Sequence, residues 1–112
     1  MRKLFLLLLS IFLIGNLTIY AQGVTDANLE GKVVSNAGEE IPGASILLTH
    51  TPSGTEYAVM SRSNGNFSFP NIKIGGPYTI VVKYIGYKDG TQEGLFLSLN
   101  QTLEVDMVLY TE

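Results

Sequence analysis

The chain contains 112 residues, carries a formal net charge of −3 and has no cysteine. This length allows a single domain with one hydrophobic core, and without cysteine that core must hold the fold with no disulfide to help it. The acidic balance and the scattered Lys and Arg residues argue against a nucleic-acid-binding surface, which needs clustered positive charge.

Residues 1–21 are predicted to be a secretory signal peptide that is cleaved after Ala21. A basic start is followed by the apolar run Leu4–Ile14 and then by smaller and more polar residues, which is the three-part layout of such peptides. The alternative is a permanent membrane anchor, because the uncharged span Leu4–Thr25 is long enough to cross a bilayer. Polar residues in the second half of that span favour the signal peptide, so we expect an exported chain.

Residues 22–28 are small and polar and predict a flexible lead-in to a domain at residues 29–110. In the domain, short runs of β-branched, aromatic and aliphatic residues alternate with Gly, Pro and Asn turn signals, a pattern typical of consecutive antiparallel strands. The predicted strands span residues 29–35, 44–49, 55–61, 66–69, 78–84, 94–99 and 102–110. No helical periodicity follows the signal peptide. We therefore predict an all-β fold, a seven-stranded antiparallel Greek-key β-sandwich.

Alternation within the runs predicts which side chains form the apolar faces of the strands. These residues are Leu29, Gly31, Val33, Ala44, Ile46, Leu48, Phe67, Phe69, Tyr78, Ile80, Val82, Tyr84, Leu95, Leu97, Leu99, Leu103, Val105, Met107 and Leu109. The third strand is ambiguous, since Tyr57, Val59 and Ser61 compete with Ala58 and Met60 for the core.

Glycine and proline mark the positions where the backbone is expected to turn or to pack closely. Gly31 lies within a strand, which predicts a close backbone approach or a bulge. Pro42 cannot donate to a β ladder, so together with Gly43 it is expected at a sheet edge or just before a strand. The other turn glycines are Gly38, Gly54, Gly65 and Gly86, and Asn64-Gly65 is the strongest hairpin signal in the chain.

No combination of residues predicts catalysis, a cofactor or a metal site. His50 is the one histidine and lies in a Pro/Gly turn, so it cannot assemble a His/Cys zinc site. Glu39 and Glu40 are adjacent, and on an extended chain they point to opposite sides, which does not suit two carboxylates acting on one bond. Gly75-Gly76-Pro77 lacks the lysine and the helix of a phosphate-binding loop. We therefore expect a chain that is not an enzyme.

Two further features leave a covalent or a binding role open. Lys32 and Asp106 fall on strands that suit an intramolecular isopeptide bond, although both are predicted to face outward. Among the tyrosines, Tyr87 and Tyr110 are expected to be the exposed ones and are the candidates for surface contact with a sugar.

Several short motifs, taken in order, resemble the carboxypeptidase regulatory-like domain family. The matching segments are Gly31-x-Val33, Gly38, Ile41-Pro42-Gly43-Ala44, Ser61 to Gly65, and Phe67. The family's hairpin has Thr and Asp where this chain has Ser61 and Arg62, so a capping bond from that Asp into the turn is not expected here. The resemblance implies a prealbumin-like β-sandwich with no peptidase activity, since the zinc ligands of such peptidases belong to another domain.

The segments His50–Thr55, Gly75–Thr79 and Ile85–Tyr87 are also similar to the N-terminus of TonB-dependent outer-membrane receptors, particularly the Oar-like branch. In those receptors the module precedes the plug and the barrel on the periplasmic side of the outer membrane. The resemblance implies an accessory domain with a structural or protein-interaction role, either the N-terminal piece of a receptor or a free-standing copy. Its expected partners are the plug and barrel or other periplasmic envelope proteins. The alternative is a free-standing extracytoplasmic module that binds carbohydrate or peptide.

Overall fold

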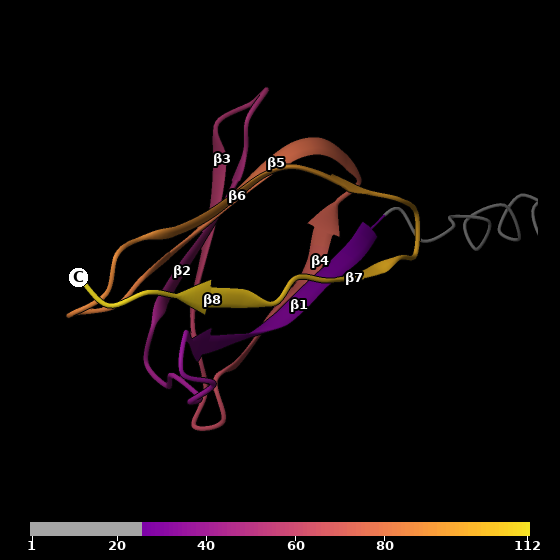
Figure 1. Ribbon diagram of the computed structural model, residues 1–112. Helices are drawn as coiled ribbons and strands as arrows, with labels where there is room; N and C mark the ends of the chain where they lie inside the picture. Colours follow the sequence, from indigo (N-terminus) through magenta and orange to yellow (C-terminus); the bar gives the residue numbers. More distant parts are fainter. Residues whose placement is uncertain (1–25) are drawn as a thin grey trace, which may run out of the picture.

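The computed structural model describes residues 26–112, which form eight strands and no helix (Figure 1). The strands are β1 (Asp26–Ser35), β2 (Ser45–His50), β3 (Thr55–Met60), β4 (Asn66–Lys73), β5 (Gly75–Lys83), β6 (Gly90–Leu97), β7 (Thr102–Glu104) and β8 (Met107–Leu109). The predicted signal peptide, residues 1–21, and residues 22–25 lie outside the described part of the chain. Within residues 26–112, no helix has the length and the hydropathy that are needed to cross a membrane.

The strands form two sheets that share one core. The first sheet has the order β4-β1-β7, and β8 also pairs with β1. The second sheet has the order β3-β2-β5-β6, and β2 pairs antiparallel with both of its neighbours along its whole length. Apolar residues from both sheets make up a single buried cluster. The predicted all-β sandwich is therefore confirmed for the described residues.

The core follows the alternation of the strands. The buried apolar residues are Ala27, Leu29, Val33, Ile41, Ala44, Ile46, Leu48, Phe67, Phe69, Ile72, Tyr78, Ile80, Val82, Leu97, Val105, Met107 and Leu109. In β3, where the pattern was ambiguous, Tyr57 and Val59 pack against the core while Met60 is 66% exposed. This strand lies at the edge of its sheet, so its inward side chains are only half-buried.

The C-terminal segment differs from the single antiparallel strand predicted at residues 102–110. It forms β7 and β8, and both run parallel to β1. The strand count is therefore eight rather than seven, and the first sheet is mixed rather than antiparallel. The break falls at Val105, whose N–H donates to the carbonyl oxygen of Glu30 at 2.8 Å and whose own carbonyl faces Gly31. Alternation cannot reveal strand direction, because it assigns the same residues to the inward face in either direction.

β4 continues past its predicted end at Pro70 and reaches Lys73. It lies at the edge of its sheet, where the missing N–H of proline costs no ladder bond. Asn71, with φ of 55°, and a register shift between Ala27 and Leu29 on β1 accompany this irregular stretch.

β6 lies earlier in the chain than the strand predicted at residues 94–99. As a result Leu99, expected in the core, is 57% exposed. It sits in a turn in which the N–H of Gln101 donates to the carbonyl oxygen of Ser98 at 3.1 Å. β1 and β5 also begin earlier than the sequence pattern predicts.

Candidate functional site

Ser61 forms hydrogen bonds with the turn that leads into β2. Its buried hydroxyl accepts the N–H of Ala44 at 2.8 Å and donates to the carbonyl oxygen of Ile41 at 2.7 Å. The main chain of Ser61 also accepts from Gly43 at 2.9 Å and donates to Ala44 at 2.9 Å. These four hydrogen bonds connect the turn that contains Pro42 to the end of β3. Sequence reasoning named Ser61 as a candidate for the core face of the third strand and as part of the family motif, but it did not predict these hydrogen bonds.

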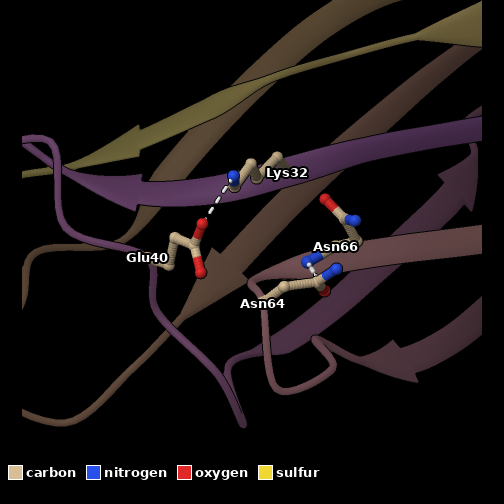
Figure 2. A network of polar contacts seen from close by, with 4 residues as sticks. All are labelled: Lys32, Glu40, Asn64 and Asn66. Atoms are coloured by element: carbon tan, nitrogen blue, oxygen red, sulfur yellow. Dashed lines mark hydrogen bonds and ion pairs between the residues drawn. The ribbon is translucent and has the colours of Figure 1, made fainter.

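The hairpin turn before β4 is capped by Asn64 rather than by the residue at position 62. The Oδ1 atom of Asn64 accepts the N–H of Asn66 at 3.1 Å (Figure 2). Gly65 has φ of 81°, and its N–H donates to the carbonyl oxygen of Arg62 at 2.8 Å. The side chain of Arg62 is exposed. An Asx-type bond from Asn64 therefore supplies a cap that arginine cannot supply.

Gly31 and Gly65 lie where the backbone of another segment comes too close for a side chain. A Cβ atom at Gly31 would lie 1.9 Å from the carbonyl oxygen of Val105 and 2.8 Å from the buried ring of Phe67. A Cβ atom at Gly65 would lie 2.6 Å from the carbonyl oxygen of Val33. The remaining motif glycines, which have positive φ and open space around them, are Gly38, Gly43, Gly54 and Gly86.

The two tyrosines predicted for surface contact lie close together at one end of the sandwich. Tyr87 forms an antiparallel bridge with Thr111, and the N–H of Lys88 donates to the carbonyl oxygen of Tyr110 at 2.8 Å. Tyr110 is 58% exposed. Tyr87 is half-buried and packs against Tyr84, with ring centroids 5.9 Å apart. Of the two, Tyr110 is the one whose ring is open to a ligand.

Three exposed apolar side chains at this end of the chain, Ile85, Val108 and Tyr110, are together called the C-terminal patch. Val108, at 44% exposed, and Tyr110 line the same hollow. This hollow, of about 560 Å³, is also lined by polar groups of Lys88 and Asp89. Ile85, at 89% exposed, precedes Gly86, whose carbonyl oxygen accepts the N–H of Glu112 at 3.2 Å. This end of the molecule therefore offers exposed apolar side chains next to charged ones.

Lys32 and Asp106 line a second hollow of about 290 Å³ on the first sheet. The Nζ atom of Lys32 lies 2.9 Å from the Oε1 atom of Glu40, and the two side chains are 39% and 49% exposed (Figure 2). The amine of Lys32 therefore pairs with Glu40 in a partly exposed position, and no hydrogen bond or ion pair between Lys32 and Asp106 accompanies this pair. The geometry does not favour an isopeptide bond between Lys32 and Asp106.

His50 makes local contacts at the end of β2. Its Nδ1 atom lies 2.6 Å from the Oγ atom of Ser53, and its ring is tilted against that of Tyr78 with centroids 5.0 Å apart. These contacts fit a polar turn residue. Among residues 26–112, no group of three or more His, Asp or Glu side chains is placed to hold a metal ion.

Tyr78 is the one described residue whose ionisation the fold clearly shifts. Its ring is fully buried, and its hydroxyl donates to the carbonyl oxygen of Lys73 at 2.6 Å. Burial raises the pKa of this hydroxyl, and the nearby Tyr57 raises it further. The neutral donor form is therefore favoured in the fold, which suits a structural bond rather than acid–base chemistry.

The described residues form a two-layer β-sandwich with a hydrogen-bonded Pro-Gly turn and a glycine hairpin. The chain belongs to the carboxypeptidase regulatory-like domain family, whose model matches residues 28–110. The match covers nearly all of the described chain and confirms the predicted family. A comparison with curated protein sequences finds no significant relative.

Solved structures show the same fold at low sequence identity. The chlorocatechol 1,2-dioxygenase from Pseudomonas putida matches with a TM-score of 0.58 and 15% identity, over 81% of this chain and 63% of the enzyme. The hydroxyquinol 1,2-dioxygenase from Pseudomonas putida DLL-E4 matches with a TM-score of 0.60 and 10% identity, over 82% and 58%. The Bacillus anthracis TIE protein matches with a TM-score of 0.65 and 14% identity, over 78% and 17%.

This chain therefore spans about three fifths of the length of each dioxygenase and less than a fifth of the TIE protein. At these identities the likeness concerns the fold alone, and neither dioxygenase chemistry nor any other activity follows from it.

Proposed function

We propose that this chain is a non-catalytic accessory domain at the periplasmic face of the outer membrane, where it serves a TonB-dependent receptor. Its role is structural or protein-interacting, and its partners are the receptor's plug and barrel or other envelope proteins. The family match over residues 28–110 supports an accessory module. The receptor context rests on the motifs that resemble receptor N-termini, such as Ile85–Tyr87.

The observation that carries the interaction role is the C-terminal patch. Ile85, at 89% exposed, is the most exposed of the large apolar side chains described. Exposed apolar surface that is rimmed by polar residues is a feature of protein contact sites when it forms a contiguous patch. The adjoining Lys88 and Asp89 provide such a border.

A photo-cross-linking amino acid placed at Ile85 in living cells tests this role. We expect a covalent product with the receptor's plug or with another envelope protein. The matched control is the same amino acid at Ser53, an exposed position in the β2–β3 turn. Equal labelling from both positions, or none from Ile85, would contradict the proposal.

The receptor context has a separate test in the genomic reading frame downstream of the Glu112 codon. A frame that continues into a plug and a series of barrel strands supports it. A stop codon at that point, without a frameshift, contradicts the fragment reading and favours a free-standing copy.

The second candidate function is a free-standing module that binds carbohydrate. The hollow beside Tyr110 favours it, because an exposed aromatic ring bordered by polar side chains such as Lys88 and Asp89 suits a sugar. Glycan-array binding that is lost in Tyr110→Ala and kept in Thr102→Ala, an exposed position on β7, would support this function. If the protein binds no glycan on the array, this second candidate function is contradicted.

A further inference from the structure

The two sheets have four edges, and three of them carry features that block the addition of another strand. β4 contains Pro70, which has no N–H, followed by Asn71 with positive φ. The opposite edge of the first sheet consists of the very short strands β7 and β8, with a break between them at residues 105–106. β6 shifts register against β5 and contains Gly94 with φ of 71°. Proline, short strands and bulges are the usual means of protecting an edge.

β3 is the fourth edge and has none of these features. It pairs with β2 over all of its residues, from Thr55 to Met60, without a shift in register. Its sequence, TEYAVM, contains no proline, glycine or lysine, and Glu56 is its single charge. An edge of this kind presents a regular row of unpaired backbone groups to the surroundings.

The hydrogen-bond pattern identifies those groups. The N–H of Ser61, just after β3, donates to the carbonyl oxygen of Ala44 at 2.9 Å, toward the β2 side. In an antiparallel pair, backbone groups alternate between facing the partner strand and facing away from it. The N–H and C=O groups of Glu56, Ala58 and Met60 therefore point outward from the edge of the sheet.

We propose that β3 pairs antiparallel with β3 of a second copy of this chain, with Ala58 on the two-fold axis. In this register Ala58 lies opposite the Ala58 of the second copy, and Glu56 lies opposite Met60. Each outward-facing residue then exchanges both of its backbone hydrogen bonds with the residue opposite. The two sheets of type β3-β2-β5-β6 join into one continuous sheet.

The side chains of β3 are complementary to themselves in this register. Tyr57 lies opposite Val59 of the second copy, on the face that packs against the core, and an aromatic residue opposite a β-branched one is a favourable cross-strand pair. Glu56 faces Met60 rather than another Glu56, so no like charges meet. Met60, at 66% exposed, and the half-buried rims of Tyr57 and Val59 lose contact with water.

A second copy fits this edge better than an unrelated strand. In a single register, the outward backbone groups form hydrogen bonds, the inward faces of the two strands match, and the two Glu56 side chains stay apart. A shift by one residue would bring the inward face of one strand next to the outward face of the other. The inference is independent of the receptor context and of the C-terminal patch, so its outcome does not decide the proposed function.

Sedimentation equilibrium of the chain expressed from its full reading frame tests the proposal. We expect a concentration-dependent dimer. Ala58→Pro removes the outward N–H without touching the bonds to β2, and it should weaken dimerisation about tenfold or more. Ala58→Thr keeps the N–H and should dimerise as the natural chain does. Circular dichroism of each variant establishes that it is folded.

A charge-swap experiment tests the register. Ala58→Lys and Ala58→Glu are changes at an exposed position, and each variant alone should be monomeric because like charges meet at the two-fold axis. An equimolar mixture should restore a dimer that contains one copy of each. Thr91→Lys, on the protected edge β6, should not affect the dimer.

Two results would overturn the proposal. One is a natural chain that remains monomeric at every concentration. The other is a dimer that persists in the unmixed Ala58→Lys and Ala58→Glu variants, since that dimer would use another surface. Capture of a different protein's strand at β3 would also replace the second copy as the occupant of this edge.

Discussion

The hydroxyl of Ser61 donates to the carbonyl oxygen of Ile41 at 2.7 Å while it accepts the N–H of Ala44 at 2.8 Å. One buried side chain thus satisfies two backbone groups on either side of the Pro42-Gly43 turn. Because buried backbone groups that lose their partners are costly, this short residue stabilises the link between the two sheets more than its size suggests.

Ser61→Ala is expected to lower the free energy of unfolding by about 1–3 kcal/mol, because it leaves the N–H of Ala44 and the carbonyl of Ile41 without this partner. Urea denaturation followed by circular dichroism measures the change. Ser63→Ala, at an exposed position in the neighbouring turn, is the matched control and should change stability by less than about 0.5 kcal/mol. Equal effects in the two variants would mean that the Ser61 bonds contribute little.

Gly31→Ala is expected to destabilise the fold by about 3 kcal/mol or more, because its Cβ atom would lie 1.9 Å from the carbonyl oxygen of Val105. Gly90→Ala is the comparison, since both glycines have ordinary φ. There the nearest atom is the end of the Leu109 side chain at 2.8 Å, which is farther away and belongs to a side chain rather than to the backbone. Thermal unfolding should therefore show a much larger loss for Gly31→Ala. A Gly90→Ala variant as unstable as Gly31→Ala would contradict the steric argument.

The stability of the fold is expected to fall in alkaline solution partly through Tyr78. Burial, with a smaller effect of Tyr57, raises its pKa in the folded state above the value of about 10 in the unfolded chain. The folded state then holds the proton more tightly, so this contribution is complete below about pH 10 and is lost as the pH rises through the folded pKa.

The measurement for this prediction is urea unfolding at neutral and alkaline pH for the natural chain and for Tyr78→Phe. The variant should lose about 1 kcal/mol at neutral pH with the bond to the carbonyl of Lys73, and should show a shallower alkaline decline. Tyr110→Phe, whose ring is exposed, should keep the slope of the natural chain. If the stability of Tyr78→Phe declines with alkaline pH as steeply as that of the natural chain, other groups cause the decline.

The ion pair between Lys32 and Glu40 is expected to contribute less than about 1 kcal/mol, because both side chains are substantially exposed and water screens them. Glu40→Gln should lower the unfolding midpoint only slightly, and added salt should reduce the difference further. Asp89→Asn, which removes the more exposed pair with Lys83, should have an equally small effect. A large loss in Glu40→Gln would indicate that Glu40 has a role beyond the pair.

Much of the fold could be predicted from periodicity and turn chemistry. In β2 and β5, strict alternation placed Ile46 and Ile80 in the core, and both are fully buried. Alternation failed for Leu99, because a turn with no alternation of its own follows β6. The parallel direction of β7 and β8 depends on pairing with β1 from the far end of the chain, which no local pattern encodes.

The candidate contact surfaces were less accessible to sequence reasoning. Tyr110 and Tyr87 look alike in the sequence, yet the ring of Tyr87 packs against Tyr84 and is half-buried. Asn64 was recognised as part of a turn, but its capping bond to Asn66 emerged only from the geometry of the hairpin. Both contacts join residues that are two or three positions apart in a turn, and the alternation of side chains along a strand does not describe turn geometry.

The parallel pairing of β1 with β7 and β8 also determines how the domain responds to mechanical force. The start of β1 and the end of β8 lie at opposite ends of the sandwich (Figure 1). A pull between Asp26 and Thr111 would act along these strands and load their ladder bonds together in shear, rather than opening them one after another. In this arrangement, tension between the two ends must break several ladder bonds at once before the strands separate.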